Sequence, residues 1–167
     1  MKPIYLLLIS LSSLQVTAQG KVESCTTQWP AEYKWKVARR TNSEVYIIPG
    51  DESISTASII GVIASRKGVR VPSIDSIISR YKAGLDTGSI LTVVDQSHDS
   101  AHLWVLFKVE TPTNGKYPEP ESDLYYIAQG EFALFDTHVA KKSSSLPSDF
   151  IDKWGAILKE SKIIKIN

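Results

Sequence analysis

The stretch over residues 73–110, SIDSIISRYKAGLDTGSILTVVDQSHDSAHLWVLFKVE, decides the fold class, because a helix pattern runs directly into a hairpin pattern. Ser73 suits the N-cap of the helix, since a serine hydroxyl can accept a hydrogen bond from an unpaired backbone N–H in the first turn. The apolar residues that follow recur at helical spacing and predict a helix over residues 74–85 with one apolar face: Ile74, Ile77, Ile78, Tyr81 and Leu85.

The second half of this stretch predicts two antiparallel strands. Residues 90–96 are rich in β-branched and apolar side chains, and residues 97–100 (SHDS) have the composition of a turn. In residues 102–110, apolar side chains then occupy every second position, at Leu103, Val105, Phe107 and Val109. This alternation is typical of a strand with two different faces.

Further elements lie on both sides of this stretch. A helix is predicted over residues 147–160, with Pro147 in its first turn and an apolar stripe that includes Trp154. Other strands are predicted at residues 34–41, 45–48, 57–65, 124–128 and 132–139, of which the last two could be one strand bent at Gly130. Together these elements predict an α+β domain in which a largely antiparallel sheet of five to seven strands has helices packed on its faces.

Length and charge limit the possible functions. A chain of 167 residues has the size of one domain and is too short for a TIM barrel or a two-domain nucleotide enzyme. Its net charge of +1 argues against a dedicated nucleic-acid-binding protein, which normally has a clear basic excess. Basic residues gather at 34–40 and at 66–70. They could contact an anionic glycan or lipid, but guarding exposed strand edges is the more common role of such residues.

The first 18 residues have the parts of a secretory signal peptide: Lys2, an apolar stretch over residues 4–14, and small residues ending at Ala18. The apolar stretch is shorter than the ~20 residues that a membrane helix needs. We expect cleavage after Ala18, with a cut after Gly20 as the alternative. The mature domain, residues 19–167, then has no net charge, no stable membrane span and a periplasmic or secreted location.

Cys25 is the only cysteine, which excludes an intrachain disulfide framework and a Cys-rich zinc site. In an oxidising compartment a single cysteine is either a free thiol or part of an intermolecular disulfide. Its position near the new N-terminus favours an unpaired thiol outside the core.

Two stretches carry a resemblance to a known family. Residues 48–53 (IPGDES) place a proline before an acidic turn, and residues 146–158 (LPSDFIDKWGAIL) form a closing helix with Leu-Pro, Trp and Ile-Leu. In these features and in the order of its elements over residues 29–163, the chain resembles small exported bacterial members of the PsbP-like superfamily. The resemblance implies an α+β fold and a role in binding or assembly, as in photosystem II or with a small GTPase of nuclear transport. It implies no site residues. The cone fold of nuclear transport factor is the alternative, although it usually begins with helices.

His98, His102 and Asp95 surround the turn of the predicted hairpin and form the candidate metal site. Two imidazoles and a carboxylate can hold zinc with an open position, which would suit a metal-assisted hydrolase. However, His98 at the tip and His102 at the start of the outgoing strand need not converge. Asp136 and His138 are two residues apart on a predicted strand, so they face the same side and could form a carboxylate–imidazole pair.

A binding role has a different set of candidate residues. The proline-rich segment 111–123 is near the length above which loops are often functional, and it presents Tyr117, Glu119 and Glu121. Arg70 lies just before the N-terminus of a predicted helix, a position that favours anions. No Gly-x-Ser-x-Gly elbow and no phosphate-binding glycine loop is present in the sequence, and we expect no cofactor. The sequence therefore favours a non-enzymatic exported domain that binds a protein or small ligand of the cell envelope, with the metal-assisted hydrolase as the alternative.

Overall fold

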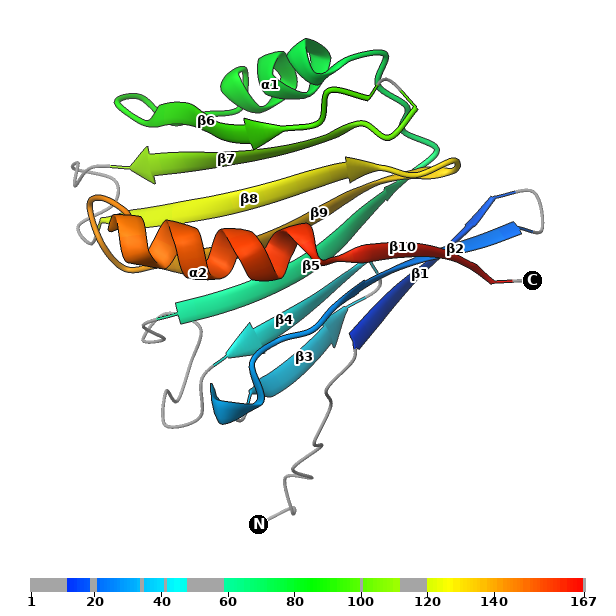
Figure 1. Cartoon of the computed structure of the whole chain (residues 1–167), viewed down its shortest axis with the longest axis horizontal. Coiled ribbons are helices and arrows are strands. Elements are labelled where there is room, and N and C mark those ends of the chain that lie inside the picture. The colour runs from blue at the N-terminus through cyan, green and yellow to red at the C-terminus, as the bar shows by residue number, and fades with distance from the viewer. Residues whose placement is uncertain are drawn as a thin grey trace.

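A computed structural model describes residues 12–18, 21–33, 35–40, 42–47, 59–99, 101–111 and 120–166 of the chain (Figure 1). The largest element is an antiparallel sheet of seven strands, which confirms the predicted α+β class. From one edge to the other, the strands are β3 (Lys36–Arg40), β4 (Ser43–Ile47), β5 (Ile59–Lys67), β9 (Ala133–Lys141), β8 (Glu121–Gln129), β7 (Trp104–Thr111) and β6 (Ile90–Gln96).

Both predicted helices are present. Helix α1 spans Ile74–Lys82, and the Ser73 hydroxyl accepts a hydrogen bond from the Ser76 backbone N–H at 3.2 Å, as its N-cap role predicts. Helix α2 spans Ser148–Lys159, so Pro147 lies at the N-cap rather than in the first turn. In the part of the chain that the structure describes, no helix is long and apolar enough to cross a membrane.

The two helices lie on opposite faces of the large sheet, because successive residues of a strand point to opposite sides. Val105, Phe107 and Val109 of β7 pack with Ile77 of α1. Leu106 belongs instead to the core that contains α2. We call these two sides the α1 face and the α2 face. The alternation predicted for residues 102–110 thus places one apolar layer under each helix.

A smaller antiparallel sheet lies on the α2 side of the molecule (Figure 1). It contains β1 (Ser12–Ala18), β2 (Lys21–Thr27) and β10 (Lys162–Ile166), with β2 in the centre. The sequence analysis predicted no strand after the terminal helix, and this prediction was incomplete: residues 162–166 pair with β2. Strand β1 falls within the predicted signal peptide and is an outer strand of this sheet.

Cys25 is buried in the core, so the prediction that it lies outside the core is wrong. The reason is that β2 is held against the α2 face, where the Cys25 Sγ atom lies 3.7 Å from the Thr137 hydroxyl. Burial raises the pKa of the Cys25 thiol to about 11, so the thiol stays protonated and unreactive near neutral pH.

Trp29 joins the beginning of the chain to the large sheet. Its ring packs against Trp35, Tyr46 and Trp154, with ring centroids 5.7, 5.1 and 6.3 Å away. It also lies directly on Gly61 of β5, where a Cβ atom would come within 2.8 Å of the indole Cη2 atom. Only glycine leaves room for the indole at this position.

We expect Gly61→Ala to lower the free energy of unfolding by about 1–3 kcal/mol, because the added methyl group overpacks the core around Trp29 and Trp154. Urea denaturation followed by tryptophan fluorescence measures this change. Gly84→Ala is the matched control, since a Cβ atom there makes only an ordinary contact at 3.6 Å with the Tyr81 carbonyl oxygen. Equal stability of the Gly61 variant and the wild type would contradict the packing argument.

Candidate functional site

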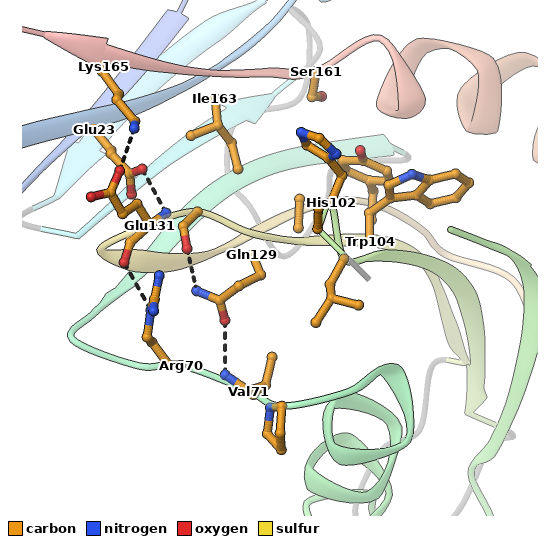
Figure 2. A pocket seen from close by; sticks show the side chains of 16 residues that line it. Glu23, Arg70, Val71, His102, Trp104, Gln129, Glu131, Ser161, Ile163 and Lys165 are labelled. Carbon is orange, nitrogen blue, oxygen red and sulfur yellow. Dashed lines mark hydrogen bonds and ion pairs between the residues drawn. The ribbon is translucent and has the colours of Figure 1, made fainter. Parts of the chain in front are cut away.

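A cavity of about 730 Å³ opens between the small sheet and one end of the large sheet. Figure 2 shows residues that line it, which come from β10, the β6–β7 turn, the β8–β9 turn and the segment before α1. We call it the intersheet cavity. Its lining includes Trp104, Tyr126, Ile163, His102, Arg70 and Glu131.

One side of the intersheet cavity is aromatic and apolar. The rings of Trp104 and Tyr126 lie 5.7 Å apart with 34° between their planes, and Ile163 of β10 belongs to the same lining. Burial raises the pKa of Tyr126 to about 12, so its hydroxyl remains a neutral hydrogen-bonding group. Aromatic side chains of this kind give a ligand a large apolar contact area together with polar atoms at their edges.

The opposite rim of the intersheet cavity is charged (Figure 2). The Arg70 Nε–H donates to the Glu131 carbonyl oxygen at 3.0 Å, and Lys165 of β10 forms an ion pair with the Glu131 carboxylate. A guanidinium has five N–H donors, of which this contact uses one. The rim therefore places the Arg70 guanidinium and the Lys165–Glu131 ion pair across from the aromatic side.

Glu23 of β2 forms the back of the intersheet cavity. Its side chain is only 1 % exposed, and its two carboxylate oxygens accept hydrogen bonds from the backbone N–H groups of Glu131 and Phe132, each at 2.8 Å. A Cβ atom at Gly130 would lie 2.5 Å from the Glu23 Oε2 atom, so this close approach requires glycine. Glu23 thus holds the cavity walls together and is occupied by the protein itself.

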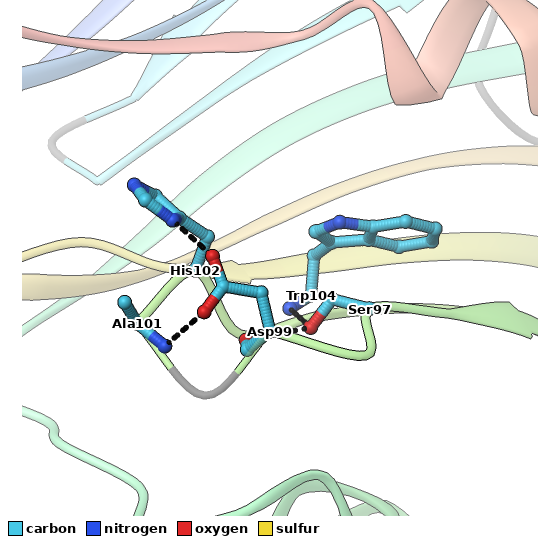
Figure 3. A network of polar contacts seen from close by, with 5 residues as sticks. All are labelled: Ser97, Asp99, Ala101, His102 and Trp104. Carbon is cyan, nitrogen blue, oxygen red and sulfur yellow. Dashed lines mark hydrogen bonds and ion pairs between the residues drawn. The ribbon is translucent and has the colours of Figure 1, made fainter.

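The β6–β7 turn positions Trp104 and His102 at the cavity (Figure 3). Asp99 accepts hydrogen bonds from the Ala101 backbone N–H at 2.8 Å and contacts the His102 Nδ1 atom at 2.7 Å. The Trp104 backbone N–H donates to the Ser97 hydroxyl at 3.4 Å. The hydrogen bond with His102 is the main cause of a lowered pKa at Asp99. These local bonds fix the turn and leave the His102 side chain 81 % exposed.

The structure does not bring His98, His102 and Asp95 together as a metal site. Asp95 accepts a hydrogen bond from Lys159 Nζ at 3.0 Å, and this contact lowers the Asp95 pKa. His102 contacts Asp99 instead, and His98 is exposed. Within the residues that the structure describes, no group of three or more His, Cys, Asp or Glu side chains is arranged to hold a metal ion.

The predicted binding residues lie in different places. Arg70 lines the intersheet cavity. Glu121 is exposed and begins β8, at the opposite end of this strand from the cavity residue Gln129, so the structure does not bring it to Arg70. Tyr117 and Glu119 lie outside the described residues, as do the residues at 48–53. Strand β8 also begins earlier than predicted, since residues 121–123 pair with β7.

Sequence analysis missed the aromatic side of the intersheet cavity. Trp104 lies in a predicted strand, but the apolar alternation of that strand drew attention to the odd-numbered residues, which face α1. Ile163 belongs to a strand that was not predicted. The alternation of side chains along the predicted strand could have indicated this side, because a period of two places Trp104 and Leu106 on the face opposite Val105.

A second polar cluster lies on the α1 face. The predicted pair is confirmed: the His138 Nδ1 atom and the Asp136 Oδ1 atom are 2.8 Å apart. The Tyr81 hydroxyl of α1 donates to the other oxygen of Asp136, a contact that sequence spacing did not predict. Arg66 lies 5.4 Å from the centre of the Tyr81 ring. We call Tyr81, Asp136 and His138 the α1-face cluster.

The groups of the α1-face cluster shift one another's pKa values. Burial alone would lower the pKa of His138 and raise that of Asp136, but their mutual attraction and hydrogen bond outweigh burial, so the pKa of His138 is raised and that of Asp136 is lowered. On the neighbouring strand β8, burial raises the pKa of Asp123 to about 6. The cluster therefore contains a charged pair within β9, and the Tyr81 hydroxyl links α1 to this pair.

We expect Asp136→Asn to lower the free energy of unfolding by about 1–3 kcal/mol near pH 6, because a buried charged hydrogen bond is lost. A raised His138 pKa stabilises the fold fully below the ordinary value of 6.5, and this contribution disappears as pH rises through the native value. The penalty should thus be smaller at pH 9, and NMR titration of the His138 imidazole should show a lower pKa in the variant.

The matched control for this experiment is Asp99→Asn, which removes a carboxylate from an exposed histidine pair. Exposed ion pairs add little to stability, so we expect this variant to unfold like the wild type. An unchanged His138 titration in Asp136→Asn would show that the carboxylate does not hold the imidazolium.

Comparison with solved structures shows the same fold in two proteins. The Ran-binding protein Mog1p of Saccharomyces cerevisiae superimposes with a TM-score of 0.57 at 10 % identity, over 92 % of this chain and 96 % of that chain. A crystal structure from Bacteroides thetaiotaomicron superimposes with a TM-score of 0.51 at 12 % identity over 83 % of this chain, which spans 44 % of the length of that protein. No family model and no curated protein matches the sequence. At these identities, the likeness shows that the chain has the α+β fold of Mog1p.

Proposed function

We propose that this chain is an exported, non-enzymatic binding domain of the cell envelope and that the intersheet cavity is its binding site. The observation that carries the proposal is the pairing of an aromatic side, Trp104 and Tyr126, with a charged rim that includes Arg70. The volume of about 730 Å³ is in the range of small-ligand sites. Such a cavity also has room for a side chain or short segment of a partner protein.

The roles of the acidic groups support binding rather than acid–base chemistry. Glu23 is held by two backbone N–H groups, and Glu131 is paired with Lys165. A general base needs a free position toward its substrate. In contrast, Trp104, Tyr126 and Arg70 line the cavity, and their aromatic surface and N–H donors suit recognition of a molecule with an apolar part and an acceptor group.

We further propose that the chain is a distant member of the PsbP-like superfamily and that its partner is a protein or small ligand of the periplasm or extracellular space. The sequence features at 48–53 and 146–158 and the fold shared with Mog1p support this proposal. Mog1p is described as Ran-binding, so the same fold serves protein recognition elsewhere. The signal-peptide pattern supports the location.

A photo-crosslinking amino acid at position 102, introduced in the producing cell, should capture the molecule that occupies the intersheet cavity. The same probe at Arg80, on the exposed side of α1, is the control position. The captured molecule should bind Trp104→Ala at least about tenfold more weakly, because buried aromatic contacts commonly contribute 2 kcal/mol or more. Equal capture at both positions, or equal affinity of Trp104→Ala and the wild type, would contradict the cavity as binding site.

If the protein is exported, the form recovered from the cell envelope should begin at Gln19. Intact-mass measurement of the recovered protein tests this N-terminus. Since β1 is an outer strand of the small sheet, its removal leaves the pairing of β2 with β10 in place. Ala18→Phe should block cleavage and cause the longer precursor to accumulate, because signal cleavage requires small residues. A cytoplasmic wild-type protein that retains residues 1–18 would contradict export while leaving the cavity proposal to its own test.

A further inference from the structure

Strand β6 is an edge of the large sheet with an apolar surface. The sheet order ends at β6, which pairs with β7 on one side and with no described strand on the other (Figure 1). In the part of the chain that the structure describes, four large apolar side chains are exposed, and three of them lie on this strand: Ile90 at 62 %, Val93 at 42 % and Val94 at 41 %. An edge of this kind is available for pairing with another strand.

The two edges of the large sheet differ in charge. Strand β3, at the opposite edge, carries Lys36, Arg39 and Arg40 within five residues. The first five residues of β6, Ile90 to Val94 (ILTVV), have no charge. Charged residues on an edge strand are a common protection against pairing between molecules. Charged residues thus protect β3 against pairing with another molecule, whereas the first five residues of β6 have no such protection.

The β6 edge carries an exposed isoleucine and a groove on the same face of the sheet. Ile90 pairs with Glu110 and Thr92 with Lys108 on β7, so both lie on the α2 face. On the same face, a groove of about 240 Å³ runs between β6 and α2, and its lining combines apolar residues such as Val94, Leu106 and Ile151 with the charged residues Asp95, Asp152 and Lys159. An exposed isoleucine therefore stands at one end of the strand, and a groove with apolar and charged walls lies at the other.

We propose that two copies of this chain form a dimer by antiparallel pairing of their β6 strands, centred on Thr92. In this register, Ile90 lies opposite Val94 of the partner subunit and reaches the groove beside α2. A two-fold axis repeats the contact, so each copy supplies one isoleucine and one groove. The pairing brings no charged side chains opposite each other, because Asp95 lies beyond it and is bound by Lys159.

The β6 bulge limits the length of this interface. The register of β6 against β7 shifts between Val93 and Asp95, which bends the strand and ends regular pairing there. Pairing over five residues buries less area than the ~1,200 Å² of a stable standard interface. The dimer should therefore be concentration-dependent. This inference is independent of the intersheet cavity, and either can fail alone.

Sedimentation velocity over a range of protein concentrations tests the proposal. The wild type should shift from monomer to dimer as concentration rises, and Thr92→Glu should stay monomeric, since it places two carboxylates opposite each other at the two-fold axis. Ile164→Glu is the matched control, because Ile164 is 43 % exposed on β10, an outer strand of the small sheet. A wild type that is monomeric throughout, or a dimer lost in Ile164→Glu but kept in Thr92→Glu, overturns the proposal.

A cysteine variant tests the register without relying on charge. In the proposed dimer, the two Thr92→Cys thiols face each other within the Cα separation of 4.4–6.8 Å that a disulfide needs. Mild oxidation should therefore link this variant faster than Ile164→Cys, and the buried Cys25 should stay reduced in both. Equal rates in the two variants would show that only random collisions form the disulfide and would overturn the register.

Discussion

A buried carboxylate joins the two sheets of this domain. Glu23 extends from the small sheet and accepts hydrogen bonds from two successive backbone N–H groups at the β8–β9 turn, Glu131 and Phe132. Such a bond is strong because a carboxylate acceptor is charged. It also explains Gly130, where a side chain would occupy the position of the carboxylate. The contact joins β2 to the β8–β9 turn, two of the segments that line the intersheet cavity.

The large sheet supports different chemistry on its two faces. On the α2 face, apolar packing around Trp29 and Trp154 joins the beginning and end of the chain. On the α1 face, the apolar layer under α1 is interrupted by Asp136 and His138, which bind each other, and by Tyr81, which ties the helix to them. The Tyr81 contact favours one docking register of α1, because a helix docked in another register would take this hydroxyl away from the Asp136 carboxylate.

The regular elements could be predicted from sequence because their patterns are local. The period of two in residues 102–110 and the stripe from Ile74 to Leu85 each report one buried face. The same reasoning found the Asp136–His138 pair. It missed Tyr81, which is 55 residues away in the chain from Asp136, and it missed β10, whose five residues form a strand only because β2 lies beside them. For the same reason Cys25 was placed outside the core, since its burial depends on partners near residues 137 and 163.

The candidate sites also differ in whether they depend on local contacts or on contacts between distant segments of the chain. The turn residues around His98 form local hydrogen bonds, as aspartate and serine in turns usually do, and so they do not converge on a metal. The aromatic side of the intersheet cavity instead requires three separate segments, those of Trp104, Tyr126 and Ile163. The period of two within one strand gives the face on which Trp104 lies, but no pattern within one segment shows which other segments meet it there.

The β6–β7 hairpin connects the two surfaces proposed for recognition. Its turn holds His102 and Trp104 at the intersheet cavity, while its outer strand is the open edge of the sheet. The Asp95–Lys159 ion pair links the end of β6 to the end of α2, and three residues after Lys159 the chain enters β10, which carries Ile163 into the cavity. A partner strand that pairs with β6 would thus contact the β6–β7 hairpin. This hairpin forms one side of the intersheet cavity through its turn and is joined to the β10 side through the Asp95–Lys159 ion pair. Exposed ion pairs contribute little to stability. The connection between the β6 edge and the intersheet cavity therefore depends mainly on the β6–β7 hairpin, whose two strands pair with each other in the large sheet.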